Sequence, residues 1–333
     1  MAILISPLWG FKTFQFVILT MFLSRFDYKF DFLGKRHIAV AASVLLMVIS
    51  LTSIVMQGLV LGLDFTGGTL VEVGYSQSAD LEGIRKTLHE NGFDDAVVQH
   101  FGTTHDVLIR VGVHEDSKED PLSTRILRLL QQGDEKVDMR RVEYVGPQVG
   151  SELIEKGGLA VLWTLAGILI YVWFRFEYRF AIGAIAALVH DTVITVGLFS
   201  LLRLEFDLTV LAALLAVIGY SLNDTIVVFD RIRENFVKLR KQPSLNVMNT
   251  SINQMLGRTV MTSVTTALVL TVLFIVGGEL IHGFSTALLF GVVIGTYSSI
   301  YIASASALAL GVSKGDLMPV VKEGAEKKTE NLW

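Results

Sequence analysis

The chain has 333 residues, of which 52% are hydrophobic and only 18% are charged, against about 25% charged in an ordinary soluble domain. The apolar residues are gathered in long runs, and the charged residues lie between the runs. This composition predicts a membrane protein and excludes the soluble, fibrous and disordered classes. A net charge of -4 gives no electrostatic reason to expect binding to nucleic acid, and the absence of cysteine excludes disulfides and thiolate metal sites.

Six apolar segments are long enough to cross a membrane. A spanning helix needs about 20 mostly apolar residues, because about 30 Å of hydrocarbon must be crossed at about 1.5 Å per residue. All five prolines lie outside the six segments, as uninterrupted helices require. The sequence therefore predicts transmembrane helices at residues 38–60, 157–174, 180–202, 208–229, 259–281 and 283–311.

The remaining residues form three segments outside these spans. Residues 1–37 precede the first span, and their apolar stretch Phe14–Leu23 is about half a span long, which favours an interfacial helix over a seventh span. Residues 61–156 separate the first two spans and are expected to fold as a domain. Residues 157–311 then hold spans two to six, and residues 312–333 form a tail.

The short loops differ in charge. Lysine and arginine gather before the first span, between spans two and three, between spans four and five, and in the tail, whereas the opposite short loops hold only Arg203. Positive charge marks the cytoplasmic side of a membrane protein. We therefore expect both termini in the cytoplasm, residues 61–156 on the extracytoplasmic side, and the first span to act as an uncleaved signal anchor.

Residues 61–156 carry local patterns in the order strand, helix, strand, strand, helix, strand. The expected elements are 70–75, 79–91, 96–101, 106–111, 121–132 and 139–145, with a turn at 102–105. This order is typical of a ferredoxin-like α+β domain, in which two helices cover one face of an antiparallel sheet. The histidines His100, His105 and His114 lack the spacing of a metal site. The domain is suited either to bind extended peptides at an edge strand or to serve as a passive scaffold.

Few ionisable residues lie inside the predicted spans, and such residues are functional candidates by default. His190 and Asp191 lie midway along the third span, and Asp224 lies about 8 Å from the inner end of the fourth. Arg258, at the inner end of the fifth span, can extend its side chain to the level of Asp224, so we expect the two to pair. Protonation of Asp224 would break this attraction and let the helices shift. Thr262 lies one turn after Arg258 on the same helical face.

Several of these features have two interpretations. Asp191 is either a second proton-binding group or a polar residue that supports a helix contact, and Asp224 is either a proton carrier or one partner of a buried hydrogen bond. Small residues at every fourth position of the sixth span serve either internal packing or a partner interface. They are Gly291, Gly295, Ser299, Ala303 and Ala307. Between spans four and five, an apolar stripe indicates a separate interfacial helix. The stripe consists of Leu245, Met248, Ile252 and Met255.

Four motifs follow one another along the chain. They are the segment 62–68 with Asp64, Gly67 and Gly68, the segment 145–150 with the sequence Val-Gly-Pro-Gln-Val-Gly, the pair His190-Asp191, and the segment 217–236 with Gly219, Asn223 and Asp224. By these motifs, residues 35–311 resemble the SecF family of the bacterial Sec protein-export machinery. Residues 1–26 are not part of the resemblance.

The resemblance implies a six-span half of a transporter of the resistance-nodulation-division type, which pairs with a similar half, SecD, in the bacterial cytoplasmic (inner) membrane. It also implies association with the SecYEG channel and use of the proton motive force to draw unfolded polypeptides outward. In the family, the positions of Asp224, Arg258 and Thr262 belong to the proton path. No enzymatic activity, cofactor or bound metal is implied.

Two other functions fit parts of the pattern. A subunit of an efflux-type secondary transporter would share the architecture, although its external region is usually larger. An intramembrane aspartyl protease would use Asp191 and Asp224 as a carboxyl pair. The protease is disfavoured because such enzymes typically need Gly-x-Gly-Asp around one acid, and because the two carboxyls are expected at different depths.

Overall fold

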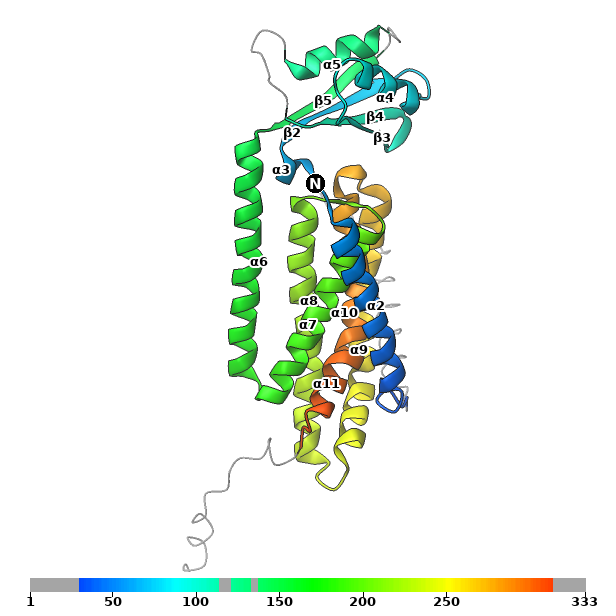
Figure 1. The fold of residues 1–333 in the computed structure, drawn as a ribbon. Helices are drawn as coiled ribbons and strands as arrows, with labels where there is room; N and C mark the ends of the chain where they lie inside the picture. The colour runs from blue at the N-terminus through cyan, green and yellow to red at the C-terminus, as the bar shows by residue number, and fades with distance from the viewer. Residues whose placement is uncertain (1–29, 114–120, 133–136, 314–333) are drawn as a thin grey trace, which may run out of the picture.

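The computed structural model describes residues 30–113, 121–132 and 137–313. It consists of a bundle of long helices with a small α+β domain at one end (Figure 1). The expected interfacial helix at 14–23, His114 and residues 314–333 of the tail lie outside the described residues.

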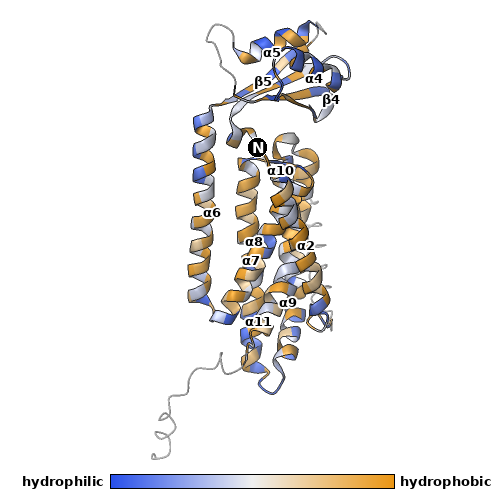
Figure 2. Cartoon of the chain, viewed as in Figure 1, coloured by the Kyte–Doolittle hydropathy of each residue, from blue (hydrophilic) through white to orange (hydrophobic). Residues whose placement is uncertain are grey.

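Six helices of the described part are long and apolar enough to cross a membrane, and this number agrees with the prediction. They are α2 (Arg36–Gln57), α6 (Pro147–Arg175), α7 (Tyr178–Leu201), α8 (Leu208–Lys238), α9 (Ser244–Val276) and the run His282–Ala309. A 3-10 turn, η1 (Glu279–Ile281), precedes this last run, which consists of α10 (His282–Ser298), a π-helical turn η2 (Ser299–Ala303) and α11 (Ser304–Ala309). Most residues along these helices are hydrophobic (Figure 2).

The helices α7, α8 and α10 form the centre of the bundle, whereas α6 stands apart (Figure 1). In the 18-residue apolar stretch of α7, 56% of the residues are buried inside the structure, whereas in that of α6 only 6% are buried. In the core, the rings of Phe180 and Phe229 pack edge to face with centroids 4.9 Å apart. The side chains of Trp163 and Phe174 on α6 are 75% and 86% exposed. The outer surface of α6 is therefore available to lipid or to another protein.

Two predicted helix boundaries were wrong. The helix that contains the second span begins at Pro147 rather than at Gly157, because proline is well suited to the first turn of a helix and nothing after it interrupts the helix. The helix α9 is continuous from Ser244, so the separate interfacial helix between spans four and five does not form. Its apolar stripe is instead buried against the extended end of α8, where Met248 and Ile252 join the core.

The α+β domain contains β2 (Gly68–Tyr75), α4 (Leu81–Glu90), β3 (Val97–Phe101), β4 (Thr103–Val111), α5 (Leu122–Gln131) and β5 (Val137–Val145). The sheet order is β3-β4-β2-β5, and each neighbouring pair is antiparallel. Alternate residues of the sheet, such as Val71 and Ile109, pack against Leu88 of α4 and Ile126 of α5. The expected turn at 102–105 is shorter than predicted, because Gly102 alone, with φ of 71°, separates β3 from β4.

A second, two-stranded element joins the domain to the bundle. The strands β1 (Val60–Leu61) and β6 (Glu205–Phe206) pair in parallel, although they are far apart in the sequence. A short helix, α3 (Leu63–Thr66), follows β1 and leads into β2. This pairing was not predicted, because two-residue strands have no detectable periodicity. It fixes the loop between α7 and α8 beside the entry to the α+β domain.

Candidate functional site

The glycine motif lies at the junction between the domain and the helices. Gly67 and Gly68 have φ values of 68° and 125°, which other residues rarely adopt. A Cβ atom on Gly67 would lie 3.1 Å from the Cα of Pro147, and one on Gly68 would collide with the carbonyl oxygen of Val111. A Cβ atom on Gly150 would lie 2.8 Å from the carbonyl oxygen of Phe65. The motifs at 62–68 and 145–150 therefore pack directly against each other.

Asp64, from the same motif, contacts the beginning of α8. Its Oδ2 accepts a hydrogen bond from the backbone N–H of Leu208 at 3.1 Å. Asp207 is the N-cap residue of α8 and accepts from the N–H of Val210 at 2.8 Å. Two carboxylates thus satisfy amides at the positive end of the helix that carries Asp224.

Arg110 links the open face of the sheet to this junction. Its Nη1 donates to the carbonyl oxygen of Leu61 at 3.1 Å and to Oε1 of Glu205 at 3.0 Å. Burial raises the pKa of Glu205, and the Arg110 guanidinium opposes that rise. A cavity of about 370 Å³ lies beside this ion pair, between the sheet and the bundle, and is also lined by Leu70 and His282.

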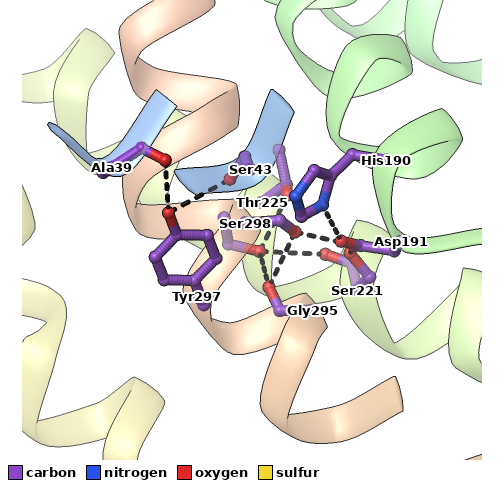
Figure 3. Close-up of polar contacts among 10 residues, drawn as sticks. Ala39, Ser43, His190, Asp191, Ser221, Thr225, Gly295, Tyr297 and Ser298 are labelled. Atoms are coloured by element: carbon purple, nitrogen blue, oxygen red, sulfur yellow. Dashed lines mark hydrogen bonds and ion pairs between the residues drawn. The ribbon is translucent and has the colours of Figure 1, made fainter. Parts of the chain in front are cut away.

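A polar cluster surrounds Asp191 in the centre of the bundle (Figure 3). Asp191 is 0% exposed and His190 is 1% exposed. Oδ1 of Asp191 lies 2.8 Å from Nδ1 of His190, and Oδ2 accepts hydrogen bonds from Ser221 of α8 and from Ser298 of α10, the latter at 2.6 Å. Three central helices therefore meet at one carboxylate.

Further hydroxyl groups extend this cluster. Thr225 and Ser299 lie 3.0 Å apart through their hydroxyl oxygens, and the hydroxyl of Ser299 also donates to the carbonyl oxygen of Gly295 at 2.9 Å. On the other side, Tyr297 donates to the carbonyl oxygen of Ala39 at 2.8 Å, which connects α10 to α2 (Figure 3). Sequence reasoning named His190 and Asp191 but missed Ser298 and Tyr297, because serine and tyrosine are common in spans and carry no charge.

The small residues of the sixth span pack inside the bundle. A Cβ atom on Gly291 would collide with Val217 of α8, and one on Gly295 would lie 3.0 Å from the Cβ of Ser221. Further along, Gly183 of α7 packs against the backbone of Ala303. Internal packing is therefore the role of this stripe in the described chain.

Asp224 and Arg258 lie in electrostatic range of each other but are not in contact. Asp224 is 4% exposed, and its Oδ2 has no hydrogen-bond partner among the described residues. The positive charge of Arg258 acts on the Asp224 carboxyl. Arg258 itself is exposed, and it forms no ion pair within 4 Å in the described part of the chain. The expected direct ion pair between Asp224 and Arg258 is therefore not formed in this structure.

The other motif residues near Asp224 face outward. Thr262 is exposed, and its hydroxyl donates to the carbonyl oxygens of Arg258 and Thr259 at 3.2 and 2.9 Å. Gly219 and Asn223 on α8 are also exposed, and a Cβ atom on Gly219 would meet no atom within 4 Å. Packing among the described residues therefore does not explain the glycine at 219.

Known proteins resemble the chain over most of its length. The family model described as "Protein export membrane protein SecD/SecF, C-terminal" matches residues 125–313, and the "SecD/SecF GG Motif" model matches residues 52–79. A protein translocase subunit SecF from Vibrio alginolyticus is 53% identical over 89% of this chain and 95% of its own length. The corresponding subunit from Pseudomonas aeruginosa is 51% identical over 87% of this chain and 94% of its own length.

A solved structure has the same fold. The crystal structure of SecDF, a translocon-associated membrane protein from Thermus thermophilus, superimposes with a TM-score of 0.78 at 39% sequence identity. The match covers 85% of this chain and 39% of the SecDF chain, so the protein described here spans about two fifths of that relative. Taken with the two matched motifs and the six apolar helices, these similarities show that the chain belongs to the SecF family of protein translocase subunits.

Proposed function

We propose that this subunit, together with SecD, uses the proton motive force to promote the passage of unfolded polypeptides through SecYEG. The observation that carries the proposal is the environment of Asp224. A carboxyl group that is buried in a membrane helix without a partner for one oxygen is costly, and such residues mark ion pathways. Asp224 is the proton carrier in this proposal, and Arg258 supplies the charge that favours its ionised form.

Motion follows from the same geometry. When Asp224 is ionised, attraction to Arg258 draws α8 and α9 together, and when Asp224 is protonated this attraction is lost. The start of α8 is bonded to Asp64 and lies beside β6, so a shift of α8 reaches the α+β domain. Thr262, which lies one turn from Arg258, and Asp191, which contacts α8 through Ser221, are further members of the proposed proton path.

The exposed polar residues near Asp224 support the partnership with SecD. Asn223, Arg258 and Thr262 would face hydrocarbon in an isolated chain, which is unfavourable. A second six-span half that covers this surface removes the cost, and the exposed Gly219 would allow its close approach. Cross-linking tests this surface, because the chain has no native cysteine. A cysteine at 223 should cross-link to SecD, whereas one at the exposed Ile170 of α6 should do so less.

We further propose that the protein lies in the bacterial inner membrane with both termini in the cytoplasm and residues 61–156 outside. The β3-β4-β2-β5 order supports classifying this domain as ferredoxin-like. Single cysteines test the orientation. A membrane-impermeant maleimide added to intact spheroplasts should label a cysteine at Asp94 and leave one at Lys241 unlabelled. The reverse result would invert the topology.

The decisive experiment compares two carboxylates of the same helix. Asp224→Asn should abolish the stimulation of export by the proton motive force in inverted membrane vesicles. Asp230→Asn is the matched control, because Asp230 is solvent-exposed in an ion pair with Arg175 at 2.7 Å. Equal export by the wild type and by Asp224→Asn, with normal assembly, would contradict the proton-carrier role.

A further inference from the structure

His190 has one ring nitrogen without a partner. The side chain is 1% exposed, and its Nε2 makes no hydrogen bond to any described residue. Leaving a buried polar atom unpaired is destabilising. The other ring nitrogen, Nδ1, lies 2.8 Å from Oδ1 of Asp191. The unpaired atom is therefore not explained by the role of His190 in holding Asp191.

Asp191, in contrast, has partners for both oxygens. Oδ1 faces the ring of His190, and Oδ2 accepts from the hydroxyl groups of Ser221 and Ser298. These three groups can all donate, so the carboxylate is satisfied as an anion. The imidazole then carries its hydrogen on Nδ1, and the free lone pair lies on Nε2.

A proton added to Nε2 would have a counter-ion next to the ring. The resulting imidazolium lies directly against the Asp191 carboxylate, so the buried pair becomes neutral overall. Among the described residues, the printed contacts of His190 and Asp191 include no other formally charged side chain. The ring of Tyr297 from α10 is 6.2 Å away between centroids, and Ser43 of α2 donates to the hydroxyl of Tyr297 at 3.1 Å.

Polar groups also continue from this cluster toward the domain end of the bundle. Thr195 lies one turn beyond Asp191 on α7, is 1% exposed and has no partner for its hydroxyl among the described residues. Further along, the hydroxyls of Ser200 on α7 and Ser53 on α2 lie 2.9 Å apart, and Ser200 also donates to the carbonyl oxygen of Gly58 at 2.8 Å. Buried hydroxyls thus occur along α7 between His190 and that end, and Ser200 lies at the contact with α2.

From these contacts we propose that Nε2 of His190 is a proton-binding atom of this subunit, with Asp191 as its fixed counter-ion. This atom is a proton-binding group in addition to the Asp224 carboxyl, and its assignment rests on the proposed proton-driven function. In this scheme Nε2 accepts a proton from a water molecule, which converts the imidazole to imidazolium, and later releases that proton to a water molecule.

Two substitutions separate binding of a proton from positioning of Asp191. His190→Asn places an amide N–H near the position of Nδ1, so it retains donation to Asp191 but has no atom that titrates. His190→Gln places its amide nearer to the position of Nε2. The control is His37→Asn, because His37 is exposed at the start of α2. Export in inverted vesicles with and without a proton gradient is the first readout.

Nitrogen-15 NMR of histidine-labelled protein in bilayers, with its partner subunit bound, is the second readout. Subtraction of the His190→Asn spectrum assigns the His190 signals, and their shifts distinguish neutral ring from imidazolium. We expect His190→Asn to lose gradient stimulation while it assembles normally, and we expect the His190 ring to become imidazolium on acidification. Wild-type stimulation in His190→Asn, or a ring that stays neutral, would overturn the proposal. If His190→Asn keeps wild-type stimulation while Asp224→Asn abolishes it in the same vesicles, the result overturns only the role of His190 and leaves the proposed proton-driven function intact.

Discussion

The carboxylate of Asp64 accepts a hydrogen bond from the backbone amide of Leu208, the first residue of α8, at 3.1 Å. This bond crosses from the glycine motif to the helix that carries Asp224. It therefore gives the motif a physical role in addition to its tight turn, because it fixes the end of α8 to the segment that enters the α+β domain.

Loss of this bond should be measurable. Asp64→Ala should lower the free energy of unfolding by about 1 kcal/mol, as removal of a helix-capping side chain does, and Asp64→Asn should lower it less. Thermal unfolding of the detergent-solubilised protein provides the measurement. The control is Asp94→Ala, since the Asp94 side chain is 75% exposed. A similar effect of the two alanine variants would argue against the capping role.

Gly68→Ala should destabilise the junction for two reasons. The φ of 125° is unfavourable for alanine, and the added Cβ would collide with the carbonyl oxygen of Val111. Such backbone strain costs about 1–3 kcal/mol. Gly92→Ala separates the two causes, because Gly92 has φ of 88° but no atom within 4 Å of an added Cβ. Unfolding midpoints should therefore fall more for Gly68→Ala than for Gly92→Ala, and the opposite order would refute the steric part.

Arg258 should act mainly through its charge, because it contacts no described carboxylate. Arg258→Lys keeps the charge but loses the planar guanidinium, so proton-stimulated export should be impaired less than in Arg258→Ala. Rates of export at a fixed proton gradient test this order. If lysine is as damaging as alanine, hydrogen bonds of the guanidinium to a partner group are required instead.

Glu205 should make the stability of the junction depend on pH. Burial raises its pKa, so between the ordinary carboxyl value and the raised value the folded state binds more protons than the unfolded state. This contribution to stability is largest at low pH and is lost as pH rises through that window. Glu205→Gln removes it while the amide oxygen still accepts from Arg110.

The measurement is the unfolding midpoint of each protein between about pH 4 and pH 7, a range that begins near the ordinary glutamate pKa. The decline of the midpoint with rising pH should be smaller in Glu205→Gln than in the wild type. Glu82→Gln, at an exposed position of α4, should retain the wild-type slope. Identical slopes in all three proteins would show that Glu205 does not titrate in this way.

The sequence was sufficient for features that depend on local pattern. The six spans follow from runs of apolar residues, and the order of strands and helices in the α+β domain follows from the spacing of apolar and polar residues. Every residue of an element contributes to these patterns. The start of α6 and the continuity of α9 were missed, because Pro147 is compatible with either a loop or a first helical turn, and the stripe with Met248 is compatible with either lipid or protein.

The contacts of the candidate site were harder to predict. Depth along a helix placed Asp224 and Arg258 at a similar level, but depth does not fix the direction of a side chain, and the two groups are not in contact here. The bonds of Asp191 to Ser221 and Ser298 join helices that are far apart in sequence. Only the packing of three helices brings these neutral residues together, so no single segment could have revealed them.

The π-helical turn Ser299–Ala303 lies where the packing of the small residues of the sixth span changes. Before it, Gly291 and Gly295 fit against α8, and at its end and beyond it Ala303 and Ala307 fit against α7. An ordinary α-helix advances 100° per residue, so deletion of one residue within the wide turn would rotate everything that follows by about that angle. The rotation of α11 about its axis thus depends on the one extra residue in the π-helical turn. A chain that lacks this residue could not keep the contacts with α8 before the turn and the contacts with α7 after it at the same time.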